Sequence, residues 1–187
     1  RSGYSVNREW SKTVNIRENG FLYVLDGYDS LIDEIARTDI RFNKEGVRGN
    51  NHVFLPNVVF RVTNLESGES HILVTDPNGS FDSANQPHSY NTNGNDYAVN
   101  DAGEVDDSLL NYEYGVWFGN GNPADSVPGS GKVGAFVIGK YRIEELACAA
   151  NEGYVLCEPF EVELYKRDNQ ESYFIGTITN NAPTLIS

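Results

Sequence analysis

The sequence is poor in cationic residues and in cysteine. Lysine and arginine number 14 against 27 aspartates and glutamates, which gives a formal net charge of −13. This charge leaves no basic surface able to follow a phosphate backbone, so we exclude a nucleic-acid-binding domain. Two cysteines, Cys148 and Cys157, are too few for a cysteine-rich zinc module or a dense disulfide scaffold. They predict either one disulfide across a short loop or two reduced thiols.

The sequence also lacks methionine, long apolar runs and the common enzyme motifs. Without methionine, the chain is expected to be a mature product or an excised segment. No run approaches the roughly 18 apolar residues of a membrane span, and no signal-peptide pattern opens the sequence. There is no Gly-x-Ser-x-Gly, His-Glu-x-x-His, phosphate-binding glycine loop or Cys-x-x-Gln thioester motif. Nothing places two carboxylates together as a glycosidase requires, so we expect no turnover enzyme.

What the sequence does contain favours β-structure. Aromatic residues make up 12%, and 18 glycines with many asparagines supply turns. One short helix is expected within residues 29–36, and two weaker strands within 1–28. Several short strands with turns between them predict an all-β sandwich. The stronger strands are expected at residues 39–44, 58–63, 70–75, 134–138, 140–145, 160–166 and 173–180.

The chain divides into an N-terminal extension, a sandwich and an insertion. Residues 1–36 are expected to pack on the sandwich as an extension, and residues 37–187 to form the sandwich domain. Residues 80–131 are rich in Asn, Asp, Gly and Ser. Because a compact domain seldom carries a structureless loop of this length, we interpret 80–131 as an insertion with short elements of its own. Loops of this kind often carry function.

Three predicted strands end their core-facing side on a polar residue. Counting every second position along the apolar side of each strand leads to Lys44, Glu145 and Asn180. Strand ends that fray into solvent carry such residues as well, but three of them together favour a shared role. Asn181 has the opposite parity, so Asn180 is the preferred amide.

These three residue types have the chemistry of an intramolecular amide bond. Burial disfavours the charged forms of lysine and glutamate. A neutral Nζ of Lys44 can attack the carboxamide carbon of Asn180. Glu145, if protonated, can polarise the carbonyl and pass a proton to the departing ammonia. The sequence therefore predicts Glu145 as the catalytic residue and Lys44 and Asn180 as the linked pair. The reaction runs once and needs no cofactor.

Short motifs in the same order resemble a known family. The stretch 141–145, Tyr-Arg-Ile-Glu-Glu, followed by Gly153-Tyr154, is similar to the Tyr-x-x-x-Glu…Gly-Tyr signature of collagen-adhesin B-type (prealbumin-like) domains. These domains occur in Gram-positive pilins and adhesins. Residues 37–75, with Phe-Arg-Val-Thr at 60–63, resemble the opening of such a domain. The likeness covers about residues 37–182 and is strongest to large surface-anchored proteins with VaFE-type repeats, which also show His88, Trp117-Phe118 and Asp125-Ser126.

The resemblance implies a fold, a location and partners. It implies a prealbumin- or immunoglobulin-like sandwich at the extracellular face of a bacterial cell wall, with a structural and adhesive role. A Lys–Asn or Lys–Asp cross-link would stiffen it. The implied partners are a host surface protein or glycan and neighbouring domains of the same surface protein, without nucleic acid and without a membrane span in this segment. The opening strand departs from the usual Lys-Val-Asp by reading Asn43-Lys44-Glu45, and cysteines are uncommon in this family.

The insertion offers further candidates. His88 and Asp125, singled out by the resemblance, are a candidate polar pair or second covalent link that pins the insertion to the sandwich; a plain surface histidine is the alternative. The acidic residues of the insertion suggest calcium, although no EF-hand spacing is present. A calcium-dependent carbohydrate- or protein-binding module using residues 80–131 is therefore the alternative function. His52 and His71 have no partner in view. The aromatic residues form either a binding platform or a small core of the insertion: Tyr112, Tyr114, Trp117 and Phe118.

Overall fold

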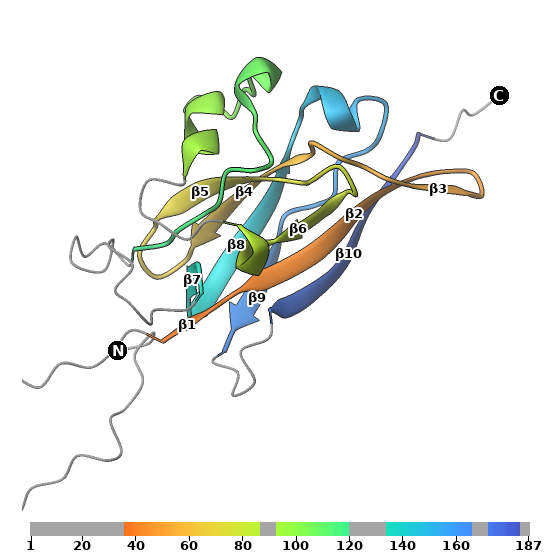
Figure 1. The fold of residues 1–187 in the computed structure, drawn as a ribbon. Coiled ribbons are helices and arrows are strands. Elements are labelled where there is room, and N and C mark those ends of the chain that lie inside the picture. Colours follow the sequence, from red (N-terminus) through yellow and green to blue (C-terminus); the bar gives the residue numbers. More distant parts are fainter. Residues whose placement is uncertain (1–35, 87–92, 120–133, 166–171, 184–187) are drawn as a thin grey trace, which may run out of the picture.

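The computed structural model describes residues 36–86, 93–119, 134–165 and 172–183, which form two facing β-sheets (Figure 1). Within these residues all helical elements are short 3-10 turns, and no helix is long and apolar enough to cross a membrane. The strands are β1 (Arg37–Thr38), β2 (Ile40–Arg48), β3 (Asn51–Phe54), β4 (Val59–Asn64), β5 (Ser70–Val74), β6 (Ser80–Asp82), β7 (Phe136–Val137), β8 (Gly139–Leu146), β9 (Phe160–Leu164) and β10 (Tyr173–Asn181).

The strand order brings distant parts of the chain together. One sheet has the order β10-β2-β3, with β6 also paired to β2, and the other has the order β5-β4-β8-β9. β1 and β7 form a separate two-stranded ladder. β10 runs parallel to β2, with Ile178 opposite Lys44 and Asn180 opposite Gly46. The last described strand therefore lies directly beside β2, one of the first.

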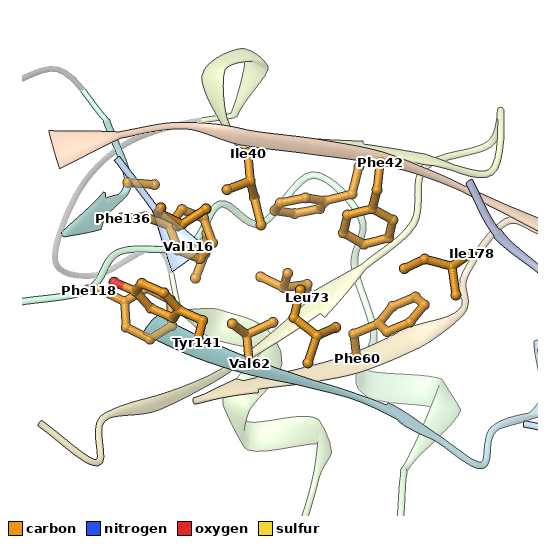
Figure 2. Close-up of a cluster of buried hydrophobic side chains, with 14 of the residues drawn as sticks. Ile40, Phe42, Phe60, Val62, Leu73, Val116, Phe118, Phe136, Tyr141 and Ile178 are labelled. Carbon is orange, nitrogen blue, oxygen red and sulfur yellow. The ribbon is translucent and has the colours of Figure 1, made fainter. Parts of the chain in front are cut away.

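Apolar side chains from the two sheets meet between the layers. In β2 every second residue is buried, as period-2 alternation requires when one face covers a core. Ile40 and Phe42 point from β2 toward Phe60 and Val62 of β4 (Figure 2). The rings of Phe42 and Phe60 pack edge to face with their centroids 5.1 Å apart. The core thus lies between the sheets, and Lys44, on the same face of β2 as Ile40 and Phe42, is buried at its edge.

The predicted all-β sandwich is confirmed, and most of its strands lie within a few residues of their expected bounds. β1, β3 and β6 were not predicted. Ser80–Asp82, at the start of the predicted insertion, pair with β2 and bury Phe81. The expected helix at 29–36 and almost all of the N-terminal extension lie outside the described residues. Ala36 alone of that segment is described, and it is not helical.

Residues 93–119 of the insertion fold on one edge of the sandwich. They contain the 3-10 turns η3 (Gly94–Ala98) and η4 (Asp107–Leu109). η3 lies against the edge strand β5 (Figure 1). Phe118 belongs to the main core and Trp117 is buried, whereas Tyr112 and Tyr114 are partly exposed. The predicted small aromatic core of the insertion is therefore wrong, because Phe118 packs on Phe136 and Tyr141 of the sandwich.

Candidate functional site

Lys44 is a fully buried lysine on the core face of β2. Its side chain follows Ile40 and Phe42 on the same face, and its exposed fraction is 0%. The backbone of Lys44 is paired on both sides, since its N–H donates to Gly79 and its carbonyl accepts from Leu55. The residue is therefore held inside the sheet and cannot turn its ammonium to solvent by fraying.

Glu145 and Asn180 reach Lys44 from two other strands. Asn180 comes from β10, the parallel neighbour of β2, and Glu145 comes from β8 in the facing sheet. Nζ of Lys44 lies 2.6 Å from Oδ1 of Asn180 and 3.3 Å from Oε2 of Glu145. Nδ2 of Asn180 donates to Oε1 of Glu145 at 2.7 Å. The structure thus brings the three predicted residues into one closed triangle of contacts.

A loop after β8 supplies two more contacts to Glu145. Residues 147–159, which we call the β8–β9 loop, include the 3-10 turn η6 (Ala149–Asn151). Nδ2 of Asn151 donates to Oε1 of Glu145 at 3.0 Å, and the backbone N–H of Cys157 donates to Oε2 at 3.0 Å. Neither residue was singled out for this role from the sequence. Their only signal was proximity to Glu145 along the chain.

Burial sets the electrostatics of the site. Desolvation lowers the pKa of Lys44, and the nearby Glu145 carboxyl opposes that shift. Burial together with Glu145 raises the pKa of the Cys157 thiol to about 12. The thiol therefore stays protonated near neutral pH and does not compete as a nucleophile. Lys44 is left as the strongest nucleophile beside the Asn180 amide.

The two cysteines are free thiols in this structure. Cys148 and Cys157 are not bonded to each other here, and the choice between the two sequence-based alternatives stays a prediction. The two residues serve different neighbours. The Cys148 thiol contacts the carbonyl of Asn57 at 3.8 Å, whereas Cys157 packs against the core beside Glu145.

A second polar cluster, partly buried, surrounds His71 on β5. Nδ1 of His71 lies 2.7 Å from Oδ2 of Asp96, and Nε2 lies 2.8 Å from Oε1 of Glu69. Ionised carboxylates only accept hydrogen bonds, so both ring nitrogens must donate and the imidazole must be charged. Burial opposes that charge, but the hydrogen bonds to Asp96 and Glu69 outweigh it and raise the pKa of His71 to about 9. No partner for His71 was in view from the sequence; in the structure its ring joins β5 to η3.

The insertion is fixed further by Asn93 and Glu69. The Asn93 side-chain amide makes two hydrogen bonds to the backbone of Trp117: it accepts from the N–H at 2.8 Å and donates to the carbonyl at 2.9 Å. Glu69 accepts the N–H of Gly119 on both oxygens. His52, the other histidine without a predicted partner, is 63% exposed and lies 3.4 Å from Glu45. The described insertion is thus tied down at both ends by residues other than His88.

The predicted pair His88 and Asp125 lies outside the described residues, so its pairing or linkage stays a prediction. The calcium alternative is also a prediction. Among the described residues no group of three or more His, Cys, Asp or Glu side chains is arranged to hold a metal ion. Two insertion carboxylates have other roles: Asp106 accepts from Ser108 at the start of η4, and Asp107 accepts from the N–H of Ala149.

No protein-family model matches the sequence, and no curated protein matches it significantly. The chain is similar to a minor pilin of Streptococcus agalactiae (15% identity, TM-score 0.41) over 83% of this chain and 50% of that one. It is similar to the TIE protein of Bacillus anthracis (18% identity, TM-score 0.40), over 81% of this chain and 18% of that one. It is also similar to a streptococcal ancillary pilin (17% identity, TM-score 0.39), over 79% of this chain and 30% of that one. The chain thus spans half or less of each of these structures.

Proposed function

We propose that this chain is a structural and adhesive domain of a Gram-positive cell-surface protein, stabilised by a self-formed amide bond between Lys44 and Asn180. The observation that carries the cross-link is the buried triangle of Lys44, Asn180 and Glu145. The location on a bacterial surface rests on the sequence resemblance to collagen-adhesin B-type domains. Glu145 is the catalytic residue of the single-turnover reaction.

The reaction follows from the contacts. Nζ of Lys44, as the neutral amine, attacks Cγ of Asn180, and a new C–N bond forms. A proton leaves the attacking nitrogen and one reaches Nδ2 of Asn180, with the Glu145 carboxyl carrying it between them. The bond from Cγ to Nδ2 then breaks and ammonia leaves. Amine plus carboxamide thus gives a secondary amide plus ammonia, and Glu145 regains its starting form.

The surroundings favour this chemistry in two ways. Lys44, Glu145 and Asn180 are 0%, 5% and 1% exposed, so little water competes for the Asn180 carbonyl. The strands β2 and β10 also hold the reacting groups in contact before any bond forms, which removes the entropy of bringing them together. Lowering the pKa of Lys44 by burial increases the fraction of neutral amine.

A covalent bond here would suit a mechanical role. β2 and β10 are neighbours in one sheet but lie far apart in sequence. A bond between them prevents β10 from being pulled away from β2. The pulling force would then be carried by a covalent bond and not by hydrogen bonds alone. The bond is also buried, so it is shielded from proteases and water. These properties support a stalk-forming or adhesive surface domain rather than a soluble catalyst.

Intact-mass measurement tests the proposal. The full chain should weigh one ammonia less than the mass calculated from its sequence. Lys44→Ala, Asn180→Ala and Glu145→Ala should each retain the full calculated mass. As a matched control, Lys140→Ala on β8, an exposed lysine, should still lose ammonia. A parent chain with the full calculated mass would overturn the proposed cross-link.

A further inference from the structure

We infer that Asn151 is a positioning residue for the cross-linking reaction: its side-chain amide, together with the N–H of Cys157, aims the Glu145 carboxyl at Asn180. This inference rests on the proposed function, since it assigns a role within the same reaction. The carrying observation is that each oxygen of Glu145 accepts one hydrogen bond from the β8–β9 loop.

The Glu145 carboxyl accepts three hydrogen bonds and also contacts Lys44, with two of these four contacts on each oxygen. Oε1 accepts from Asn180 at 2.7 Å and from Asn151 at 3.0 Å. Oε2 faces Lys44 at 3.3 Å and accepts from the N–H of Cys157 at 3.0 Å. One contact on each oxygen therefore belongs to the reacting pair and the other to the β8–β9 loop. The two loop donors fix the plane of the carboxyl so that its other lone pairs point at Lys44 and Asn180.

Asn151 is itself fixed, which a positioning residue requires. It is 3% exposed, and all three of its side-chain hydrogen bonds stay within the protein. Nδ2 donates to the carbonyl of Leu146 at 2.8 Å as well as to Glu145, and Oδ1 accepts from the N–H of Cys148 at 2.9 Å. One N–H of the amide thus serves the reaction site, whereas its bond to Leu146 and its acceptor oxygen hold the start of the β8–β9 loop.

This division of the amide separates a catalytic effect from a folding effect. Asn151→Asp keeps an oxygen that can accept from Cys148, so this bond of the turn η6 remains, although the bond to the Leu146 carbonyl is lost. It loses the N–H that reaches Glu145 and sets a second carboxyl against Oε1. Asn151→Ala loses both halves. If Asn151 only closes the turn, Asn151→Asp should react like the parent; if it positions Glu145, both variants should react slowly.

Buried Asn95 is the matched control. It is 1% exposed and also holds a loop by two hydrogen bonds, donating to the carbonyl of Asn111 and accepting its N–H. It lies on η3 in the insertion and makes neither of these bonds to the Lys44 site. Asn95→Ala should therefore cost similar stability but leave the rate of cross-linking unchanged.

The experiment follows cross-linking over time in the full-length chain. Freshly synthesised protein is quenched in denaturant at intervals, and intact mass gives the fraction that has lost ammonia. Asn151→Ala and Asn151→Asp should react about 10- to 100-fold more slowly than the parent, the range expected when a catalytic group is slightly misplaced. Thermal unfolding of each chain before it reacts shows whether a slower loss of ammonia is accompanied by a loss of folding stability.

The outcomes are distinct. Parent-like rates for both Asn151 variants overturn the positioning role while leaving the cross-link intact. A parent-like rate for Asn151→Asp with a slow Asn151→Ala also overturns it, because the turn alone then explains the effect. If neither variant folds, the role of Asn151 is structural and the inference fails. If the parent never loses ammonia, the proposed function itself fails.

Discussion

Nζ of Lys44 lies 2.6 Å from Oδ1 of Asn180, although the two residues are 136 positions apart in the sequence. The contact exists because β2 and β10 run parallel as neighbours and present these side chains to the same interior. A bond at this contact would close most of the described sandwich into one covalent loop. Its effect on stability should therefore be large, since long loops lose the most entropy on closure.

Removing the bond should lower the free energy of unfolding by up to about 5 kcal/mol. This is the loop-closure value for a cross-link spanning somewhat more than 100 residues, with a disulfide as the reference. The double variant Lys44→Met, Glu145→Gln is the cleanest test, because it removes both charges together and leaves no buried ion unpaired. Denaturant unfolding of parent and variant measures the difference. A variant as stable as a fully cross-linked parent would contradict the prediction.

Strand alternation accounts for how much of the site could be predicted from the sequence. Lys44 and Glu145 each lie on a strand whose apolar neighbours reveal its buried face, so period-2 counting was enough to place them inside. In β10 the count from Ile178 reaches buried Asn180, but Phe174, counted on the same face, is exposed, since the register shifts between Phe174 and Gly176. Because each sheet has one buried face, the two sheets were expected to pack with these faces together. The β-class was predictable for the same reason, since turns and alternation are local signals.

The contacts made by loops could not be predicted in this way. Asn151 and Cys157 reach Glu145 through a loop whose path depends on the 3-10 turn η6 and on how the loop packs. His71 meets Asp96 only because η3 folds back onto β5. No periodicity in the sequence encodes either approach. The sequence resemblance directed attention to His88 instead, and the insertion's tie at His71 was missed.

The charge on His71 should make the protein less stable at alkaline pH. The pKa of His71 is about 9 in the folded chain and about 6.5 when unfolded, so the folded state binds the proton more tightly. This contribution is fully present below pH 6.5 and is lost as the pH rises through 9. The loss amounts to about 3 kcal/mol. Denaturant unfolding at intervals between pH 6 and pH 10 should show this decline.

Two histidine variants isolate that effect. His71→Gln should flatten the decline between pH 6.5 and 9, because the group that binds the extra proton is gone. His52→Gln is the matched control: this histidine is 63% exposed, and its removal should leave the profile unchanged. The charged groups in contact with His71 are Glu69 and Asp96, from β5's own turn and from η3. An equally steep decline in His71→Gln would show that another group is responsible.

The tie between β5 and η3 should also protect the insertion from proteases. Asp96→Ala removes one of the two acceptors of the His71 ring and the acceptor of the Ile72 N–H, so residues 93–119 should become cleavable while the sandwich core survives. Mass mapping of the fragments after limited proteolysis gives the positions of the cuts. His88→Ala is tested beside it. Cleavage in 80–131 for His88→Ala would support its predicted role, and protease resistance would leave His88 a surface residue.

Gly46 sets how closely the β8–β9 loop can approach the cross-link site. A Cβ at Gly46 would come within 2.5 Å of the Tyr154 ring, and Tyr154 follows Asn151 in the same loop. Gly46→Ala should therefore push Tyr154 outward and cost about 1–3 kcal/mol of stability, the usual range for overpacking. Because the same loop holds Glu145, the variant should also lose ammonia more slowly than the parent.

Gly49→Ala separates this clash from a general glycine effect. Gly49 has φ of 60°, and an added Cβ there meets nothing within 4 Å, so the variant should pay only backbone strain of about 1 kcal/mol. Its rate of ammonia loss should equal that of the parent, because Tyr154 and the loop stay in place. Thermal unfolding and timed intact mass on both variants give the comparison. If Gly46→Ala cross-links as fast as Gly49→Ala, the position of Tyr154 does not govern the reaction.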